Sequence, residues 1–202
     1  MSETATTHRN GALSLPNLLT YGRIAAVPAV VVCLFWPEDV WTRSIALGIY
    51  ITAAVTDYLD GWLARAWSQQ SALGRMLDPI ADKLLVAACL LMLASDGTIH
   101  GWSMWAAIII LCREILVSGL REFLAELRVS VPVTRVAKWK TTFQLLAIGF
   151  LVAGPAGERV LPGTITIGIV LLWLSAVLTL YTGWDYMKAG IKHLVEEDAL
   201  RP

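Results

Sequence analysis

Long apolar runs alternate with short polar segments along almost the whole chain. A helix that crosses a bilayer needs about 20 mostly apolar residues. Runs of this kind lie at residues 18–36, 44–66, 79–95, 102–123, 137–154 and 164–186. The pattern predicts an all-α integral membrane protein with six transmembrane helices. Ser14 followed by Pro16 is typical of a helix start, so we also expect a short N-terminal juxtamembrane helix.

The six predicted spans leave little chain for a separate soluble domain. We expect a polar N-terminal segment over residues 1–15, a membrane catalytic domain over residues 16–188 and a polar C-terminal tail over residues 189–202. The first apolar run is long for a signal sequence, and no small-residue cleavage site follows it. We therefore interpret this run as a retained span.

The charged residues predict the orientation of the chain. If the N-terminus is cytoplasmic, Arg43 and Arg159 fall on the outer side, Arg113 lies within the fourth span, and the other Lys and Arg residues fall on the inner side. This follows the positive-inside rule and predicts a multi-pass protein of the cytoplasmic (inner) membrane. The formal net charge of 0 gives no indication of a nucleic-acid partner.

Four carboxylates interrupt the apolar pattern around the second and third spans: Asp57, Asp60, Asp78 and Asp82. A charge at bilayer depth costs about 2.5–3.5 kcal/mol on insertion scales, so such residues usually mark function. Spacings of three and four place each pair on one helical face. We expect the third helix to open at Met76, after a short connector that lets the two faces meet.

Carboxylates that converge in a medium of low dielectric constant repel one another unless cations lie between them. Ligand sets made only of oxygen favour magnesium, manganese or calcium over zinc or copper. The four aspartates therefore predict a site for one or two divalent cations. No histidine lies close to them in the sequence, which argues against a zinc site.

Small and basic residues follow Asp57 on the same helix. Gly61 and Ala64 would open space beside the cations, or would serve close packing between helices. Arg65 would clamp a diphosphate through paired hydrogen bonds, or would anchor the helix at the membrane interface. Gly74 falls in the predicted connector.

Taken with their spacing, these eight residues resemble the signature of the CDP-alcohol phosphotransferase family, and every fixed position is present. The resemblance implies a six-helix membrane fold, usually a homodimer, with two metal ions, often Mg²⁺ or Mn²⁺, bound on the cytoplasmic side. Its metal ligands would be Asp57, Asp60, Asp78 and Asp82. Its CDP-diacylglycerol site would comprise Asp57, Asp60, Gly61, Ala64, Arg65 and Gly74.

The same resemblance makes Asp82 the general base. An alcohol is a poor nucleophile at neutral pH, so a carboxylate that accepts its proton during attack lowers the barrier. Bound metals would neutralise the diphosphate and stabilise CMP as it leaves.

Segments outside the signature indicate which alcohol accepts the phosphatidyl group. They resemble the bacterial phosphatidylglycerophosphate synthases at Pro16–Thr20 with Arg23, Arg113–Ile115, Gly119–Glu122, Lys138–Thr141 with Gln144, and Asp185–Tyr186. The reaction implied is transfer of a phosphatidyl group from CDP-diacylglycerol, a lipid of the membrane, to glycerol 3-phosphate.

An anionic acceptor needs cations, and the candidates for its phosphate are Arg113, Arg121, Lys138 and Lys140. The alternative is that Arg113 pairs with a carboxylate such as Glu114 or Glu122. The lysines would then only set topology and bind anionic lipid head groups.

Other functions stay open on the sequence alone. The acceptor could instead be phosphatidylglycerol, inositol phosphate or serine. A cation transporter would also place aspartates in the membrane, although no matching acidic site appears in the last three spans. A non-catalytic lipid-binding or assembly protein is a third class.

Overall fold

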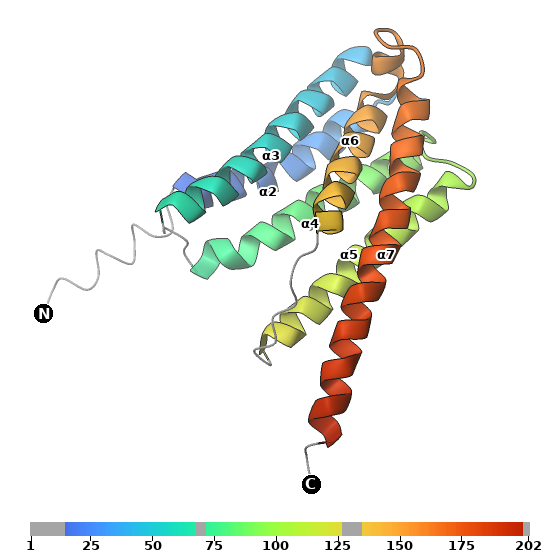
Figure 1. The fold of residues 1–202 in the computed structure, drawn as a ribbon. Coiled ribbons are helices and arrows are strands. Elements are labelled where there is room, and N and C mark those ends of the chain that lie inside the picture. The colour runs from blue at the N-terminus through green and yellow to red at the C-terminus, as the bar shows by residue number, and fades with distance from the viewer. Residues whose placement is uncertain (1–14, 68–71, 127–134, 200–202) are drawn as a thin grey trace, which may run out of the picture. The chain divides into compact units, whose positions relative to one another are not determined.

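The computed structural model describes residues 15–67, 72–126 and 135–199, and every element within them is an α-helix (Figure 1). The helices are α2 (Leu15–Leu34), α3 (Val40–Trp67), α4 (Ala72–Ser95), α5 (Ser103–Glu126), α6 (Arg135–Glu158) and α7 (Thr164–Ala199). Each contains most or all of one predicted apolar run, so the all-α prediction is confirmed. The helix start expected at Ser14 and Pro16 corresponds to the start of α2, which begins at Leu15 and continues into the first apolar run as one helix.

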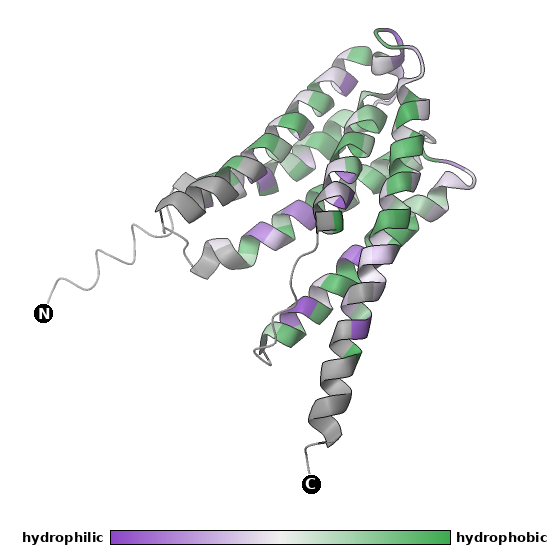
Figure 2. Cartoon of the chain, viewed as in Figure 1, coloured by the Kyte–Doolittle hydropathy of each residue, from purple (hydrophilic) through white to green (hydrophobic). Residues whose placement is uncertain are grey.

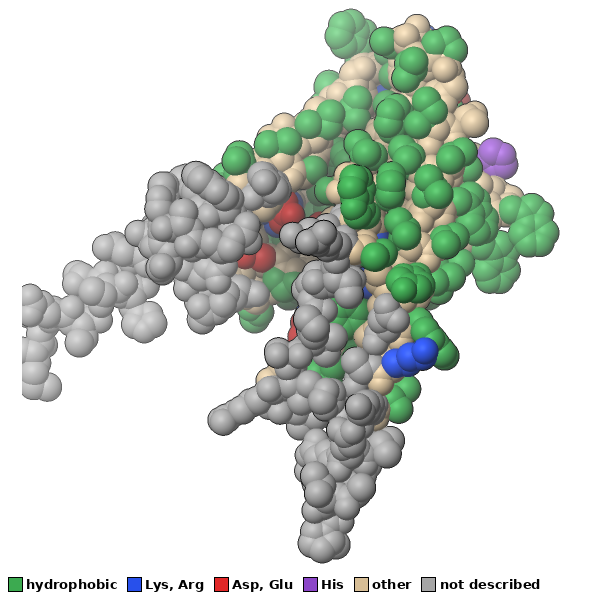
Figure 3. Space-filling view, viewed as in Figure 1, with side chains coloured by type: hydrophobic (Ala, Val, Ile, Leu, Met, Phe, Trp, Pro, Cys, Tyr) green, Lys and Arg blue, Asp and Glu red, His purple; other side chains and the backbone are tan. Residues whose placement is uncertain are grey.

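The helices have the composition of a membrane protein. Three of them contain stretches long and apolar enough to cross a bilayer, at Asn17–Leu34, Ser103–Ala125 and Thr164–Lys188. Figure 2 shows mostly hydrophobic residues along the described helices, with hydrophilic residues gathered in the first half of α4 and the last half of α5. Hydrophobic side chains cover most of the described surface visible in Figure 3. The count of six spans stays a prediction.

The chain divides into two compact units, which we describe separately. The first comprises Met1–Thr98 with Ile148–Ile165, and the second comprises Ile99–Ala147 with Thr166–Pro202. Within the first unit, α2 packs against both α3 and α4. A side chain on α2 can therefore contact residues from either neighbour.

The turn between α2 and α3 explains the start of α3. The carboxylate of Asp39 accepts hydrogen bonds from the backbone amides of Trp41 (3.3 Å) and Thr42 (3.2 Å). This is the N-cap arrangement that satisfies amides at the first turn of a helix. The loop between the two helices is short, since α2 ends at Leu34 and α3 begins at Val40.

The start of α4 corrects two predictions. The helix begins at Ala72 rather than Met76, and Gly74 lies inside its first turn rather than in a connector. Good helix formers such as Ala72 and Leu73 extend the helix toward the N-terminus, and one glycine costs a helix only about 1 kcal/mol. Asp78 and Asp82 consequently lie within the helix, on one face.

A break near the end of α6 is the main irregularity of the first unit. Gly154 has φ 45° and ψ −129°, and Pro155 follows it. Proline has no amide hydrogen, so the carbonyl of Leu151, four residues earlier, loses its helical donor. Such a carbonyl needs another partner when it is buried.

Arg43 of α3 supplies that partner. Its side chain is buried, and its guanidinium donates to the carbonyls of Leu151 (3.2 Å) and Val152 (3.3 Å). It also forms an ion pair with Asp96, donates to the Thr98 hydroxyl at 3.2 Å and donates through Nε to the Pro37 carbonyl at 3.3 Å. This cluster joins the beginning of α3 to the end of α4 and to the broken turn of α6.

We predict that Arg43→Met destabilises the protein by about 3–5 kcal/mol, because it leaves a buried carboxylate without its cation. The thermal unfolding midpoint in detergent should fall by roughly 10 °C. Arg43→Lys should give an intermediate loss, since an ammonium keeps the charge but lacks the planar fork. Arg159→Met, at an exposed position, is the control and should change little. Equal midpoints for Arg43→Met and the wild type would contradict this account.

Candidate functional site

Two carboxylates of the first unit are held by one turn of α2. The Thr20 hydroxyl donates to Oδ1 of Asp78 at 2.5 Å. Nη1 of Arg23 lies 2.5 Å from Oδ1 of Asp57. Thr20 and Arg23 are three residues apart, so they lie on the same face of α2. Two of the predicted metal ligands, one from α3 and one from α4, are thus fixed by a single helical turn.

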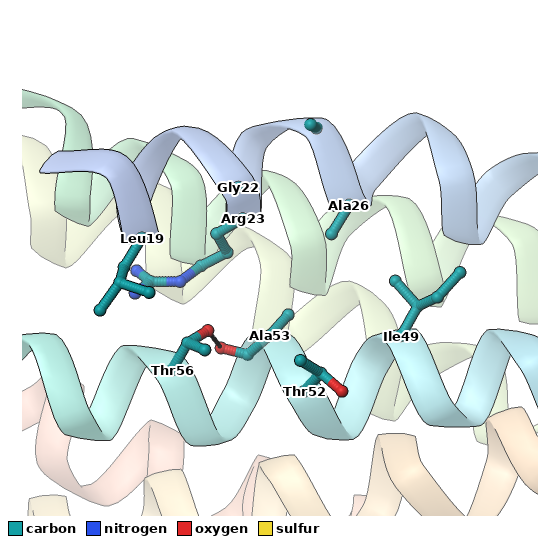
Figure 4. Close-up of a pocket in the computed structure, with 9 residues that line it drawn as sticks. Leu19, Gly22, Arg23, Ala26, Ile49, Thr52, Ala53 and Thr56 are labelled. Carbon is teal, nitrogen blue, oxygen red and sulfur yellow. Dashed lines mark hydrogen bonds between the residues drawn. The ribbon is translucent and has the colours of Figure 1, made fainter. Parts of the chain in front are cut away.

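A groove runs beside this turn. It has a volume of about 390 Å³ and lies between α2 and α3, where mostly small or apolar side chains line it. Figure 4 shows Arg23 of α2 and Thr56 of α3 extending into the space between the two helices, with Ala26 and Ile49 farther along. Arg23 therefore lines an apolar groove while its guanidinium pairs with Asp57.

The predicted donor-side residues divide into two groups. Asp78 and Asp82 are half-buried on the same face of α4, and Gly74 is buried. Asp57 has a side chain that is 45% exposed, so it is reachable from outside the helix pair. The side chains of Asp60, Gly61, Ala64 and Arg65 lie outside the described residues, although all four positions belong to α3.

The described carboxylates suit a hard divalent cation. Asp57 and Asp78 offer only oxygen, the ligand atom that magnesium and manganese prefer. Each has two oxygens, and the α2 contact of each engages only Oδ1. Within the described residues no three His, Cys, Asp or Glu side chains form a ligand cluster. Asp60 and Asp82 are the predicted residues that would add to this pair, and the residues present fit a Mg²⁺ or Mn²⁺ ion.

The second unit contains a cluster of cations around one carboxylate. Nζ of Lys140 forms an ion pair with Oε1 of Glu114, and Nη1 of Arg113 lies 3.7 Å from the same oxygen. Nη2 of Arg113 donates to the Thr182 hydroxyl at 2.8 Å. The predicted alternative, in which Arg113 pairs with Glu114, is therefore realised. Two cations share one carboxylate, however, so these three residues still carry a net positive charge.

The remaining acceptor-side residues extend this cluster toward the end of α5. Nη2 of Arg121 donates to the Tyr186 hydroxyl at 3.1 Å, and the guanidinium lies 5.3 Å from the centre of that ring. The side chain of Lys138 lies outside the described residues. Nε of Arg113 is buried and has no hydrogen-bond partner in the described part of the chain. A buried donor of this kind is available to an anionic ligand.

Several residues that shape these two clusters were not predicted. Thr20 and Arg23 belonged to a resembling segment but were assigned no role, and Glu114 was considered only as an alternative partner. A Cβ at Gly183 would lie 3.1 Å from Cγ of Arg113, so a larger residue at this position would crowd the Arg113 side chain. The available signal was a hydroxyl and an arginine on one face of a mostly apolar first helix.

The sequence is similar to known proteins over most of its length. The sequence model of the CDP-alcohol phosphatidyltransferase family matches residues 13–181. A protein of Rickettsia bellii is 42% identical over 180 residues, covering 89% of this chain and 97% of its own length. Relatives from Pectobacterium atrosepticum (39%, 91% and 98%) and Cereibacter sphaeroides (36%, 91% and 98%) are similar over the same extent. All three are named CDP-diacylglycerol–glycerol-3-phosphate 3-phosphatidyltransferase.

Proposed function

The chain belongs to the CDP-alcohol phosphatidyltransferase family, and we propose that it transfers the phosphatidyl group of CDP-diacylglycerol to glycerol 3-phosphate. Relatives that are named for this reaction match about nine tenths of the chain. The observation that carries the proposal is that two carboxylates, Asp57 of α3 and Asp78 of α4, are both contacted by one turn of α2. The named relatives do not support the alternative function of a cation transporter.

In the proposed reaction, Asp82 accepts the proton of the acceptor hydroxyl. The hydroxyl oxygen then forms a bond to the phosphorus that carries the diacylglycerol. The bond between this phosphorus and the oxygen bridging to CMP breaks, and CMP leaves with the electron pair. Bound Mg²⁺ or Mn²⁺, held by the aspartates of α3 and α4, would offset the negative charge of the diphosphate.

The donor site in this proposal includes Asp60, Gly61, Ala64 and Arg65 on α3, together with Gly74 on α4. A buried glycine lets backbone and ligand approach closely, as at Gly74. An arginine at the end of α3 suits a diphosphate because its donors form a planar fork.

The acceptor phosphate is assigned to the cations of the second unit, Arg113, Arg121, Lys138 and Lys140. A net positive charge around Glu114 and the unpartnered Nε of Arg113 support this assignment. A neutral acceptor such as serine would not require these cations.

The proposal also covers the location, orientation and oligomeric state of the enzyme. We infer a six-span protein of the inner membrane with its N-terminus and active site on the cytoplasmic side, acting as a homodimer with two ions. The distribution of Lys and Arg supports the orientation.

The test of the function is an assay of the purified protein in detergent. With CDP-diacylglycerol, glycerol 3-phosphate and Mg²⁺, we expect CMP and phosphatidylglycerophosphate in equal amounts. EDTA should abolish both products. Asp82→Asn should lower kcat by roughly 10²–10⁴-fold, the usual contribution of a general base, while CDP-diacylglycerol still binds.

Serine, inositol phosphate and phosphatidylglycerol should be assayed in parallel as alternative acceptors. Turnover with one of these, and none with glycerol 3-phosphate, would overturn the acceptor assignment but leave the family's chemistry intact. Full activity of Asp82→Asn would remove that residue from the base role.

Arg113→Lys should raise the KM for glycerol 3-phosphate by roughly 10- to 100-fold. A hydrogen bond to a charged group contributes about 1.5–3 kcal/mol, and lysine cannot reproduce the fork. The KM for CDP-diacylglycerol should stay unchanged. Gly183→Ala should shift the acceptor KM in the same direction by a smaller factor, because its methyl group presses on Arg113. Arg159→Lys is the matched control, and equal acceptor KM values for Arg113→Lys and this control would contradict the assignment.

A further inference from the structure

The side chains of Thr20 and Arg23, both on α2, contact two of the predicted metal ligands. Both are buried, with exposed fractions of 1% and 2%. Burying a polar side chain is costly unless its bonds are satisfied, and a buried arginine is costlier still. Their placement in an apolar helix therefore needs a reason beyond packing.

The reason lies in how the contacts are distributed. One contact goes to α3 and the other to α4, and α2 packs against both helices. Residues three apart on a helix move together as a rigid turn. The turn of α2 therefore fixes Asp57 and Asp78 relative to each other, which neither α3 nor α4 achieves alone.

We propose that Thr20 and Arg23 are positioning residues for the divalent cations. Each binds Oδ1 of one aspartate, so that the other oxygen of that carboxylate is presented to the metal. This inference rests on the proposed function, because it assumes that Asp57 and Asp78 are metal ligands. Residues that hydrogen-bond to ligating carboxylates usually change metal affinity by 10- to 100-fold when they are lost.

The two residues act differently. The hydroxyl of Thr20 fixes the Asp78 carboxylate without adding charge to the site. The guanidinium of Arg23 also offsets the repulsion between the carboxylates. Replacing Arg23 by Lys keeps this charge and removes only the planar geometry. Replacing Thr20 by Val keeps the shape and removes only the hydroxyl.

The chain offers a matched control in Thr52. This threonine lines the same groove from α3 (Figure 4), but its hydroxyl donates to the backbone carbonyl of Gly48 at 2.8 Å. Thr52→Val therefore removes a hydroxyl from the groove without touching a carboxylate.

The experiment is a Mn²⁺ titration of the full-length protein in detergent, followed by electron paramagnetic resonance of the free ion, with no substrate present. We expect Thr20→Val and Arg23→Lys to bind Mn²⁺ 10- to 100-fold more weakly than the wild type. Thr20→Ser, which restores the hydroxyl, and Thr52→Val should bind within about threefold of it. Unfolding midpoints in EDTA show whether each variant is folded before its affinity is compared.

Enzyme kinetics supply a second readout. In Thr20→Val the Mn²⁺ concentration for half-maximal activity should rise by the same factor, and kcat at saturating Mn²⁺ should approach the wild-type value. A residue that touched the reacting atoms would lower kcat at every metal concentration.

Two results would overturn the inference, and they differ from each other. If the wild type binds Mn²⁺ and folded Thr20→Val binds it equally well, the positioning role is wrong and the proposed function stands. If the wild type binds no Mn²⁺ at all, the metal requirement of the proposed function fails together with the inference.

Discussion

A carboxylate within an apolar helix bundle must be paired, and this requirement organises the described part of the molecule. Apolar surroundings have a low dielectric constant, so each charge buried among them needs a hydrogen bond or an opposite charge. Arg23 meets this need for Asp57, and Thr20 contributes a hydrogen bond to Asp78. Because both donors lie on one turn of α2, the partners that stabilise the carboxylates also fix the geometry of the proposed metal site.

The same physics appears where no chemistry is proposed. Arg43 and Asp96 form a buried pair at the other end of α3, beside the turn of α6 that Gly154 and Pro155 break. There the arginine also completes the hydrogen bonds of backbone carbonyls. The Arg43–Asp96 pair is buried, and its contacts join three helices. Asp57, in contrast, is 45% exposed and keeps an oxygen for a further ligand, which separates a structural ion pair from a binding site.

Much of the fold followed from the sequence because hydrophobic runs alone determine where membrane helices lie. The aspartates were also found directly, since their spacing sets the helical face they share. What the sequence did not predict depends on contacts between helices. Gly74 was placed in a connector, because glycine is a weak local signal and the helix formers before it extended α4. Glu114 as the shared partner of Arg113 and Lys140 required knowing that α5 and α6 bring these residues together.

The most direct test of the account is a crystal structure of the protein with Mn²⁺ and CDP-diacylglycerol, with anomalous scattering measured at the manganese edge. The account predicts anomalous peaks at the carboxylates of Asp57 and Asp78, with Thr20 and Arg23 still in contact with them and the diphosphate beside the ions. Manganese bound elsewhere, or a diphosphate bound away from these carboxylates, would contradict it.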